Sequence, residues 1–200
     1  MRGEAMSRIC ERAISEGESL GSYRALEFFA REGDWQTKSY AHLVGELDAW
    51  ELDPQYEKAL RTNLPQAHVR IGDSFKFAHE SQYQQHINWL VIDNPQMIYG
   101  NYCEHFEALE LAPKLMASTG VVIFNVNKKP FDYDSHPDWK LRRRAYYGCV
   151  ASKLETSFLF DFYGDLIEKL GFNVRYLYEE PRNSEYLSYI VVGVTRSGSI

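Results

Sequence analysis

The chain has 200 residues, of which 44% are hydrophobic and 25% are charged, a composition typical of one globular domain and not of a disordered or fibrous protein. With 22 Lys and Arg against 28 Asp and Glu, the formal net charge is -6, which argues against a surface devoted to nucleic acid or anionic lipid. The three cysteines lie far apart, and no apolar run approaches the ~18 residues that would span a bilayer. We therefore expect a single domain over residues 1–200, in the cytoplasm and without membrane attachment.

Apolar patterning predicts alternating strands and helices over the first two thirds of the chain. Residues 1–21 contain an amphipathic helix that ends near Gly17 and Gly21. Short apolar runs closed by turn residues predict five strands, at 23–30, 44–52, 68–71, 89–92 and 120–126. Helical spacing predicts the connections, at 37–43, 54–64, 75–86 and 102–116. Such alternation is typical of a parallel sheet that helices cover on both faces.

The last third of the chain follows a different pattern. Large apolar residues recur at steps of four and predict one long helix with a buried face, formed by Leu154, Phe158, Phe162, Leu166 and Leu170. Two further strands, in 172–178 and 187–195, are joined by a short turn region and predict a terminal antiparallel hairpin. The expected fold class is therefore α/β, with a seven-stranded, mostly parallel sheet, and no linker-like segment divides the chain into two domains.

Acidic residues stand at or near the carboxyl ends of the first four strands. Glu27, Glu51, Asp73 and Asp93 follow one another at intervals of 24, 22 and 20 residues. Ligands of open α/β sheets bind at these strand ends, so the four carboxylates would converge on one rim. Carboxylates suit a cationic ligand with ribose hydroxyls and an amino-purine, and they would repel a pyrophosphate. The competing interpretation, strongest for Asp73, is that such acids only close turns or cap helices.

With these acids the sequence resembles the class I S-adenosylmethionine-dependent methyltransferases, over nearly its whole length. The resemblance implies a Rossmann-like sheet and S-adenosyl-L-methionine as the cofactor. It also implies the cofactor-binding residues, which are Glu27, Phe29, Gly33, Asp34, Glu51, Leu52, Asp73, Ser74 and Asp93. The sequence departs from the family's ExGxGxG loop, since Phe29 and Arg31 stand where the first two glycines would be. Because a side chain there would occupy the cofactor's place or forbid the turn, we expect shifted or weakened cofactor binding.

The substrate side of the site is expected after the fourth strand. Asp93-Asn94-Pro95 resembles the Asp/Asn-Pro-Pro-aromatic motif of some relatives, although Gln96 and Met97 replace its last two residues. The resemblance implies that Asp93 and Asn94 orient or deprotonate the methyl acceptor.

The segment that follows adds further candidates. His105 is a candidate general base because an imidazole titrates near pH ~6.5, and its competing interpretation is an ordinary exposed helix histidine. Pro95, Tyr99 and Tyr102 are expected to line the acceptor pocket. The expected catalytic residues are thus Asp93, Asn94 and His105.

Residues 128–150 interrupt the alternation of strands and helices and are expected to form a substrate-facing lid. Between Lys128 and Arg144 the segment carries a net charge of +3, with aromatic residues among the basic ones. Arg142, Arg143 and Arg144 are the expected contacts to an anionic substrate or to a nucleic-acid strand. The competing interpretation is a solvated, charged helix.

The predicted function is methyl transfer from S-adenosyl-L-methionine to an O or N atom of a small molecule, with an anionic metabolite as one option. An RNA or DNA methyltransferase is the first alternative, and a non-catalytic methyltransferase-like module is the second. No HxxxH or CxxC spacing exists, so no metal is expected. The sequence indicates neither the oligomeric state nor the methyl acceptor.

Overall fold

The computed structural model describes residues 3–94, 98–99, 102–130, 135–148, 153–182 and 186–198, and only the backbone at 98–99 and 102–103. The strands are β1 (Arg24–Phe28), β2 (Glu46–Glu51), β3 (His68–Ile71), β4 (Ile87–Ile92), β5 (Ile98–Tyr99), β6 (Tyr102–Cys103), β7 (Met116–Asn127), β8 (Phe172–Pro181) and β9 (Leu187–Arg196). The α-helices are α1 (Glu4–Ser15), α2 (Thr37–Tyr40), α3 (Glu57–Asn63), α4 (Ser74–Phe77), α5 (Phe106–Leu109), α6 (Ala112–Leu115), α7 (Pro137–Tyr147) and α8 (Thr156–Lys169). Short 3-10 helices occur at Leu20–Ser22, Pro54–Tyr56 and Ser81–Tyr83.

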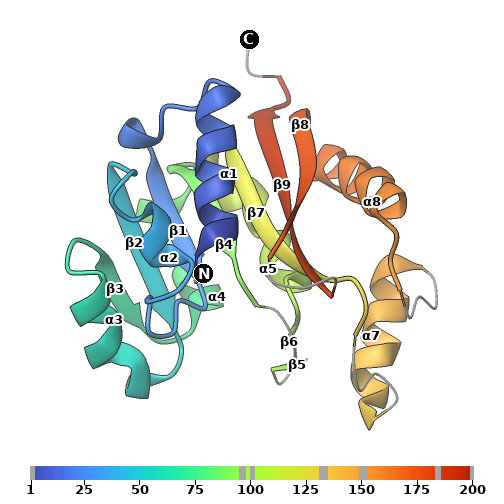
Figure 1. Ribbon diagram of the computed structural model, residues 1–200, viewed down its shortest axis with the longest axis horizontal. Helices are drawn as coiled ribbons and strands as arrows, with labels where there is room; N and C mark the ends of the chain where they lie inside the picture. The colour runs from blue at the N-terminus through green and yellow to red at the C-terminus, as the bar shows by residue number, and fades with distance from the viewer. Residues whose placement is uncertain are drawn as a thin grey trace.

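Seven strands form one sheet in the order β3-β2-β1-β4-β7-β9-β8 (Figure 1). The pairs β1–β2, β2–β3, β1–β4 and β4–β7 are parallel. β9 runs antiparallel to both β7 and β8, so the last two strands form a hairpin. The predicted α/β fold, with a seven-stranded, mostly parallel sheet and a terminal antiparallel hairpin, is therefore confirmed.

Helices cover both faces of the sheet and bury two separate apolar clusters. α1, which lies in front of the sheet in Figure 1, buries Met6 and Ile9 in a cluster that includes Trp89 and Tyr189. α2 and α3 contribute to the same cluster. On the other face, α5, α6 and α8 bury their apolar residues against the alternate side chains of the same strands. A sheet that is buried on both faces explains why its strands have near-continuous apolar sequences.

The strand order reverses between β1 and β4, which places the ends of these two strands side by side. The chain runs outward through β2 and β3 and then returns to β4 on the other side of β1. Phe28 is the register partner of both Trp50 and Ile92. The segments that follow β1, β2 and β4 therefore leave the sheet as neighbours, at the position where open α/β sheets bind ligands.

Two predicted helices are wrong in extent. The helix expected over 102–116 is instead strand β6 followed by the short helices α5 and α6, because Glu104 has a left-handed backbone and Pro113 lies in the first turn of α6. Proline lacks the N–H that a continuing helix needs, so it begins a new helix more readily than it extends one. The polar helix expected over 75–86 is α4 followed by a 3-10 turn. Among the described residues, no helix is long and apolar enough to cross a bilayer.

The buried face of α8 is also different from the predicted one. Leu159, Tyr163 and Ile167 are fully buried, whereas Phe158 and Phe162 are only partly buried at the edge of the cluster. The predicted row of leucine and phenylalanine therefore lies one position away from the centre of the buried face. α8 and β8 nevertheless pack as consecutive elements, as the sequence predicts.

Candidate functional site

The loop after β1 has the backbone geometry of a glycine-bearing turn although it holds two larger residues. Phe29, Arg31 and Gly33 all have left-handed backbone conformations, with φ angles of 62°, 48° and 66°. The Phe29 ring packs against the core, with its centroid 5.8 Å from that of Phe28. The Arg31 side chain is 66% exposed and its guanidinium lies 5.2 Å from the centroid of the Tyr56 ring. The two larger residues therefore do not prevent the turn, and the shifted or weakened cofactor binding stays a prediction.

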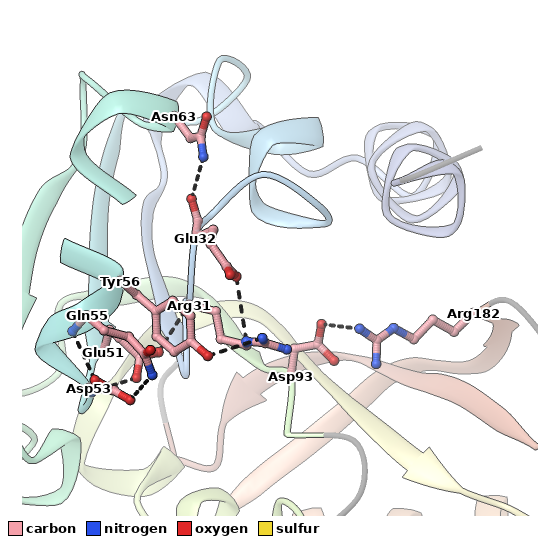
Figure 2. Close-up of polar contacts among 9 residues, drawn as sticks. All are labelled: Arg31, Glu32, Glu51, Asp53, Gln55, Tyr56, Asn63, Asp93 and Arg182. Atoms are coloured by element: carbon pink, nitrogen blue, oxygen red, sulfur yellow. Dashed lines mark hydrogen bonds and ion pairs between the residues drawn. The ribbon is translucent and has the colours of Figure 1, made fainter. Parts of the chain in front are cut away.

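Glu51, at the end of β2, holds this loop in place. Its Oε2 accepts a 2.7 Å hydrogen bond from the backbone N–H of Arg31, and its Oε1 accepts a 2.8 Å bond from the N–H of Asp53 (Figure 2). A second tie runs from the N–H of Ala30 to the carbonyl of Trp50, at 3.0 Å. A carboxylate offers about four lone-pair positions, so each Glu51 oxygen keeps the capacity for one more donor. Glu51 can therefore fix the loop and still accept from a pair of hydroxyls.

Gly33 is required by packing as well as by its backbone conformation. A Cβ atom at this position would lie 2.7 Å from the Cδ1 atom of Leu60 on α3 and 2.7 Å from the Cδ1 atom of Leu64, the residue after this helix. The Nδ2 of Asn63, on the same helix, donates a 2.8 Å hydrogen bond to the carbonyl of Glu32 (Figure 2). The end of the loop is thus fixed against α3.

Glu27 lies inside β1 and is 2% exposed. Its carboxyl group accepts a hydrogen bond from the hydroxyl of Tyr40 on α2. Burial, followed by the nearby charge of Asp93, raises the pKa of Glu27 to about 8, against the lowering effect of the Tyr40 bond. The carboxyl group therefore carries a proton at neutral pH in most molecules.

Asp93 follows β4 and forms an ion pair with Arg182, which comes from the end of β8 (Figure 2). The Nη2 of Arg182 and the hydroxyl of Tyr189 both donate to the Oδ2 of Asp93, each at 3.0 Å. Burial raises the pKa of Asp93, and the charge of Arg182 opposes this effect. The acid expected on the substrate side is thus already bound to a cation from the same chain.

Of the remaining cofactor candidates, Leu52 follows β2, Asp73 and Ser74 follow β3, and Asp34 lies in the loop after β1. The Oδ1 of Asp73 accepts a 3.0 Å hydrogen bond from the N–H of Phe75, so this side chain caps α4. Ser74, the first residue of that helix, is buried. Leu52 is 61% exposed, and Asp34 is partly buried. Asp73 therefore caps a helix through its Oδ1 atom, as the competing interpretation predicts.

Asn94 and His105 lie in the interior and not on an open rim. The Nδ2 of Asn94 donates to the carbonyl of Glu104 at 2.8 Å, which holds the left-handed turn before α5. His105 has no exposed surface, and its Nε2 is 2.6 Å from the hydroxyl of Tyr163. Burial, followed by the charge of Arg143, lowers the pKa of His105 to about 3. Both interpretations of His105, a general base on the rim and an exposed histidine, are corrected by this burial.

The three arginines of the expected lid have different surroundings. Arg143 is 1% exposed, and it pairs with the buried Glu104 and donates a 2.8 Å bond to the carbonyl of Asn127. Arg142 pairs with Glu107 at 2.8 Å. Only Arg144 is an exposed side chain. The expected lid is therefore α7, which is attached to the body of the protein through its arginines, and Arg143 does not face a substrate.

Three substrate candidates cannot be compared with the structure. Pro95 lies outside the described residues, and so do the side chains of Tyr99 and Tyr102. The backbone of the latter two forms the small antiparallel pair β5–β6.

The partners of the strand-end acids do not follow from the sequence. Tyr40, Arg182 and Tyr189 bind Glu27 and Asp93 from positions 13 to 96 residues away in the chain. The only available signal was an arginine just beyond the first strand of the terminal hairpin. No group of three or more His, Cys, Asp or Glu side chains in the described part of the chain is arranged to hold a metal ion.

Comparisons with known proteins identify the fold. No protein-family model and no curated protein sequence matches the chain. Many solved structures match it, among them Trm1 from Pyrococcus horikoshii in complex with S-adenosyl-L-methionine, with a TM-score of 0.66 and 10% identity over 96% of this chain and 55% of that one. TYW2 from M. jannaschii in complex with AdoMet has a TM-score of 0.55 and 13% identity over 95% of this chain and 76% of that one.

A third match is a protein from Pyrococcus horikoshii described as an RNA methyltransferase candidate, with a TM-score of 0.55 and 18% identity over 98% of this chain and 83% of that one. This chain thus spans between 55% and 83% of the lengths of the three proteins. These likenesses agree with the reversal of strand order between β1 and β4 and with the antiparallel β9. The chain has the fold of the class I S-adenosylmethionine-dependent methyltransferases.

Proposed function

We propose that the protein is an S-adenosylmethionine-dependent methyltransferase that acts on an O or N atom of a small molecule. The observation that carries this proposal is the loop after β1. It keeps left-handed backbone conformations at positions 29, 31 and 33, beside Glu51 and at the reversal of strand order. Such a conformation costs about 1–2 kcal/mol at a residue other than glycine, so its retention at two such residues favours a functional turn.

The residues around this loop fit the cofactor. Glu51 would accept from the ribose hydroxyls, because each of its oxygens keeps an open lone pair. The turn from Phe29 through Gly33 to Asp34, above the buried Glu27, would surround the methionine moiety. The adenine would lie between the ends of β2 and β3, beside Leu52, Asp73 and Ser74. S-adenosylmethionine supplies an electrophilic methyl group on a sulfonium sulfur.

The acceptor would lie beside Asp93, on the other side of the reversal point. Most of the rate acceleration in such a displacement comes from alignment of the nucleophile with the methyl group. Asp93 is suited to orient an acceptor because Arg182 and Tyr189 hold its carboxylate at one oxygen. The anionic character of the substrate has less support, since Arg142 and Arg143 are paired with Glu107 and Glu104.

Calorimetric titration with S-adenosylmethionine tests the proposal. We expect saturable binding that Glu51→Ala weakens by about tenfold or more, since hydrogen bonds to a charged group contribute roughly 1.5–3 kcal/mol. Glu46→Ala is the matched control, because this residue lies at the opposite end of the same strand and its side chain is 63% exposed. It should bind the cofactor as the unmodified protein does. Absence of binding at millimolar cofactor would refute the proposal and favour a non-catalytic module.

A nucleic-acid methyltransferase is the second candidate. One neighbour of the same fold is described as an RNA methyltransferase candidate, and it aligns with 98% of this chain. The net charge of -6 and the pairing of two lid arginines count against this candidate.

A further inference from the structure

Among the described residues, the ion pair between Asp93 and Arg182 is joined by one hydrogen bond. An arginine and a carboxylate commonly pair through two parallel bonds, which satisfy two donors and two acceptors. Among the contacts between described residues, the guanidinium of Arg182 donates only through Nη2, and it shares the Oδ2 of Asp93 with the hydroxyl of Tyr189. The Oδ1 of Asp93 and the Nε of Arg182 are both buried and have no hydrogen-bond partner among the described residues.

A third unpartnered group lies next to this pair. Asn125 on β7 is 1% exposed, and neither its Oδ1 nor its Nδ2 has a partner in the described part of the chain. Asn125 is the register partner of Tyr189, whose hydroxyl donates to Asp93. Ile92, the residue before Asp93, is the register partner of Phe124, the residue before Asn125. Asp93 and Asn125 therefore lie side by side at the ends of adjacent strands.

Burying these polar atoms without partners costs more free energy than packing alone explains. Each buried polar group without a partner costs about 1–3 kcal/mol, and native proteins retain few of them. An apolar side chain at position 125 would avoid this cost inside an otherwise apolar strand. The side chains of Asp93 and Arg182 are each 10% exposed, so the pair lies near the surface although its unpartnered atoms are buried. Unsatisfied donors and acceptors that gather at one strand end are a sign of a ligand or of ordered water.

We propose that Asp93, Arg182 and Asn125 form the recognition site for a planar amide edge of the methyl acceptor. The N–H of such an edge would donate to the Oδ1 of Asp93, and its C=O would accept from the Nε of Arg182. The amide of Asn125 offers one further donor and one further acceptor beside them. This inference rests on the proposed methyltransferase function, because it names the acceptor of that reaction.

Charge balance favours an uncharged edge over an anion or a cation. Arg182 neutralises Asp93 within the pair, and the adjacent Glu27 carries a proton at neutral pH, so these three groups together have no net charge. An anion would face the open oxygen of Asp93, and a cation would face the guanidinium of Arg182. Carboxamides, ureas and nucleobases such as uracil all present an uncharged N–H and C=O in one plane.

Small probes test the site directly, by ligand-observed NMR on the full chain. Benzamide and uracil carry the edge, whereas benzoate and benzylamine have similar sizes and a charge in its place. We expect the two amide probes to bind about tenfold more tightly than the charged ones. Uridine and an oligouridylate present the same amide edge, as a free nucleoside and within an RNA strand. Preferential binding of either one supports the amide site and shows whether the acceptor is a small molecule or an RNA.

Two variants separate recognition from folding. Arg182→Lys keeps the charge beside Asp93 but removes Nε, and Asn125→Leu replaces the amide with an apolar side chain of similar size. We expect each to weaken benzamide binding about tenfold while the protein stays folded by circular dichroism. Arg61→Lys, which alters the exposed Arg61–Glu57 pair on α3, is the matched control and should not change binding.

The inference fails if the four small probes bind alike, or if both variants bind benzamide as the unmodified protein does. The open atoms would then hold only ordered water. Calorimetry with S-adenosylmethionine keeps this failure distinct from failure of the proposed function. Cofactor binding without amide selectivity overturns the inference alone, and amide selectivity without cofactor binding overturns the methyltransferase proposal and leaves an amide-binding site.

Discussion

Arg31 has a backbone conformation that L-residues seldom adopt, with φ at 48°. The left-handed conformation costs about 1–2 kcal/mol, whereas glycine adopts it freely and loses roughly 0.5–1 kcal/mol through its more flexible unfolded chain. We therefore expect Arg31→Gly to raise the free energy of unfolding by about 0.5–1 kcal/mol, measured by urea denaturation. The hydrogen bond from its N–H to Glu51 would remain, since it belongs to the backbone.

Arg61→Gly is the control for this variant, because Arg61 lies within α3. It should lower the free energy of unfolding by about 1 kcal/mol, the usual cost of glycine in a helix. If both variants were equally destabilising, the strain attributed to the loop would be absent.

Glu27 should make the stability of the fold depend on pH. Its pKa is raised from 4.5 to about 8 in the folded protein, so between these values the folded state binds more protons than the unfolded state. The stability that this proton provides is complete below pH 4.5 and is lost as the pH rises toward and through 8. Glu27→Gln, which stays uncharged, should therefore lose less stability than the unmodified protein between pH 5 and about 8.5.

Urea denaturation midpoints over this pH range measure the effect. Glu46→Gln, which changes an exposed carboxylate at the start of β2, is the control. Its urea midpoint should vary with pH as that of the unmodified protein does. Parallel curves for the unmodified protein and Glu27→Gln would contradict the raised pKa.

At the scale of elements, a buried ion pair attaches α7 to the segment between β6 and α5. Arg143 and Glu104 are each 1% exposed, and the indole N–H of Trp139 also donates to the Oε1 of Glu104. Arg143→Met leaves a buried charge without its partner and should cost about 3–5 kcal/mol, and Glu104→Gln should cost a similar amount. The double variant should cost clearly less than the sum, because it leaves neither charge.

A double-mutant cycle measured by chemical denaturation gives this coupling. The comparison pair joins Arg142 on α7 to Glu107 on α5, and these side chains are 32% and 31% exposed. Its coupling should be only about 0.5 kcal/mol, because solvent screens it. Similar couplings in the two cycles would mean that the buried pair does not attach α7.

Local sequence patterns predicted the elements well where turn residues bound them. β3 has the predicted limits 68–71, between the proline at position 65 and the glycine at position 72. The buried face of α8 was misplaced because hydrophobic periodicity does not identify a buried tyrosine. Tyr163 is fully buried since its hydroxyl bonds to both His105 and Tyr147. Periodicity therefore located the helix but not its orientation.

The candidate site was predictable only in part, because its residues come from distant parts of the chain. Local sequence patterns set the ends of strands, so the positions of Glu27, Glu51 and Asp93 followed from the sequence, whereas the order of the strands depends on tertiary packing. Their partners do not, because Arg182 reaches Asp93 across 89 residues through the pairing of β9 with β7 and β8. The burial of His105 likewise depends on α8, which lies more than fifty residues further along the chain.

At the scale of the whole molecule, the net charge of -6 is not offset by an open basic surface on α7. Two of its three consecutive arginines are paired with acids from the segment after β6, and only Arg144 is an exposed side chain. Residues 128–144 have a net charge of +3 in the sequence, but two of their arginines are paired with acids from outside this segment, so the segment does not present this charge at the surface. Affinity for nucleic acid depends on phosphate contacts from exposed cations, which makes strong RNA binding unfavourable here.

Fluorescence anisotropy with a single-stranded RNA oligonucleotide tests this expectation. Non-specific binders reach dissociation constants of roughly 10⁻⁴–10⁻⁶ M at physiological salt, and we expect this protein to bind more weakly than that range. Lowering the salt concentration should change the affinity little. The slope of log affinity against log salt is about one unit per phosphate contact, and we expect few such contacts. Arg144→Ala is the matched variant, since it removes the exposed arginine of the three. Micromolar binding with a steep salt slope that Arg144→Ala reduces by about one would instead establish RNA as the substrate class to pursue.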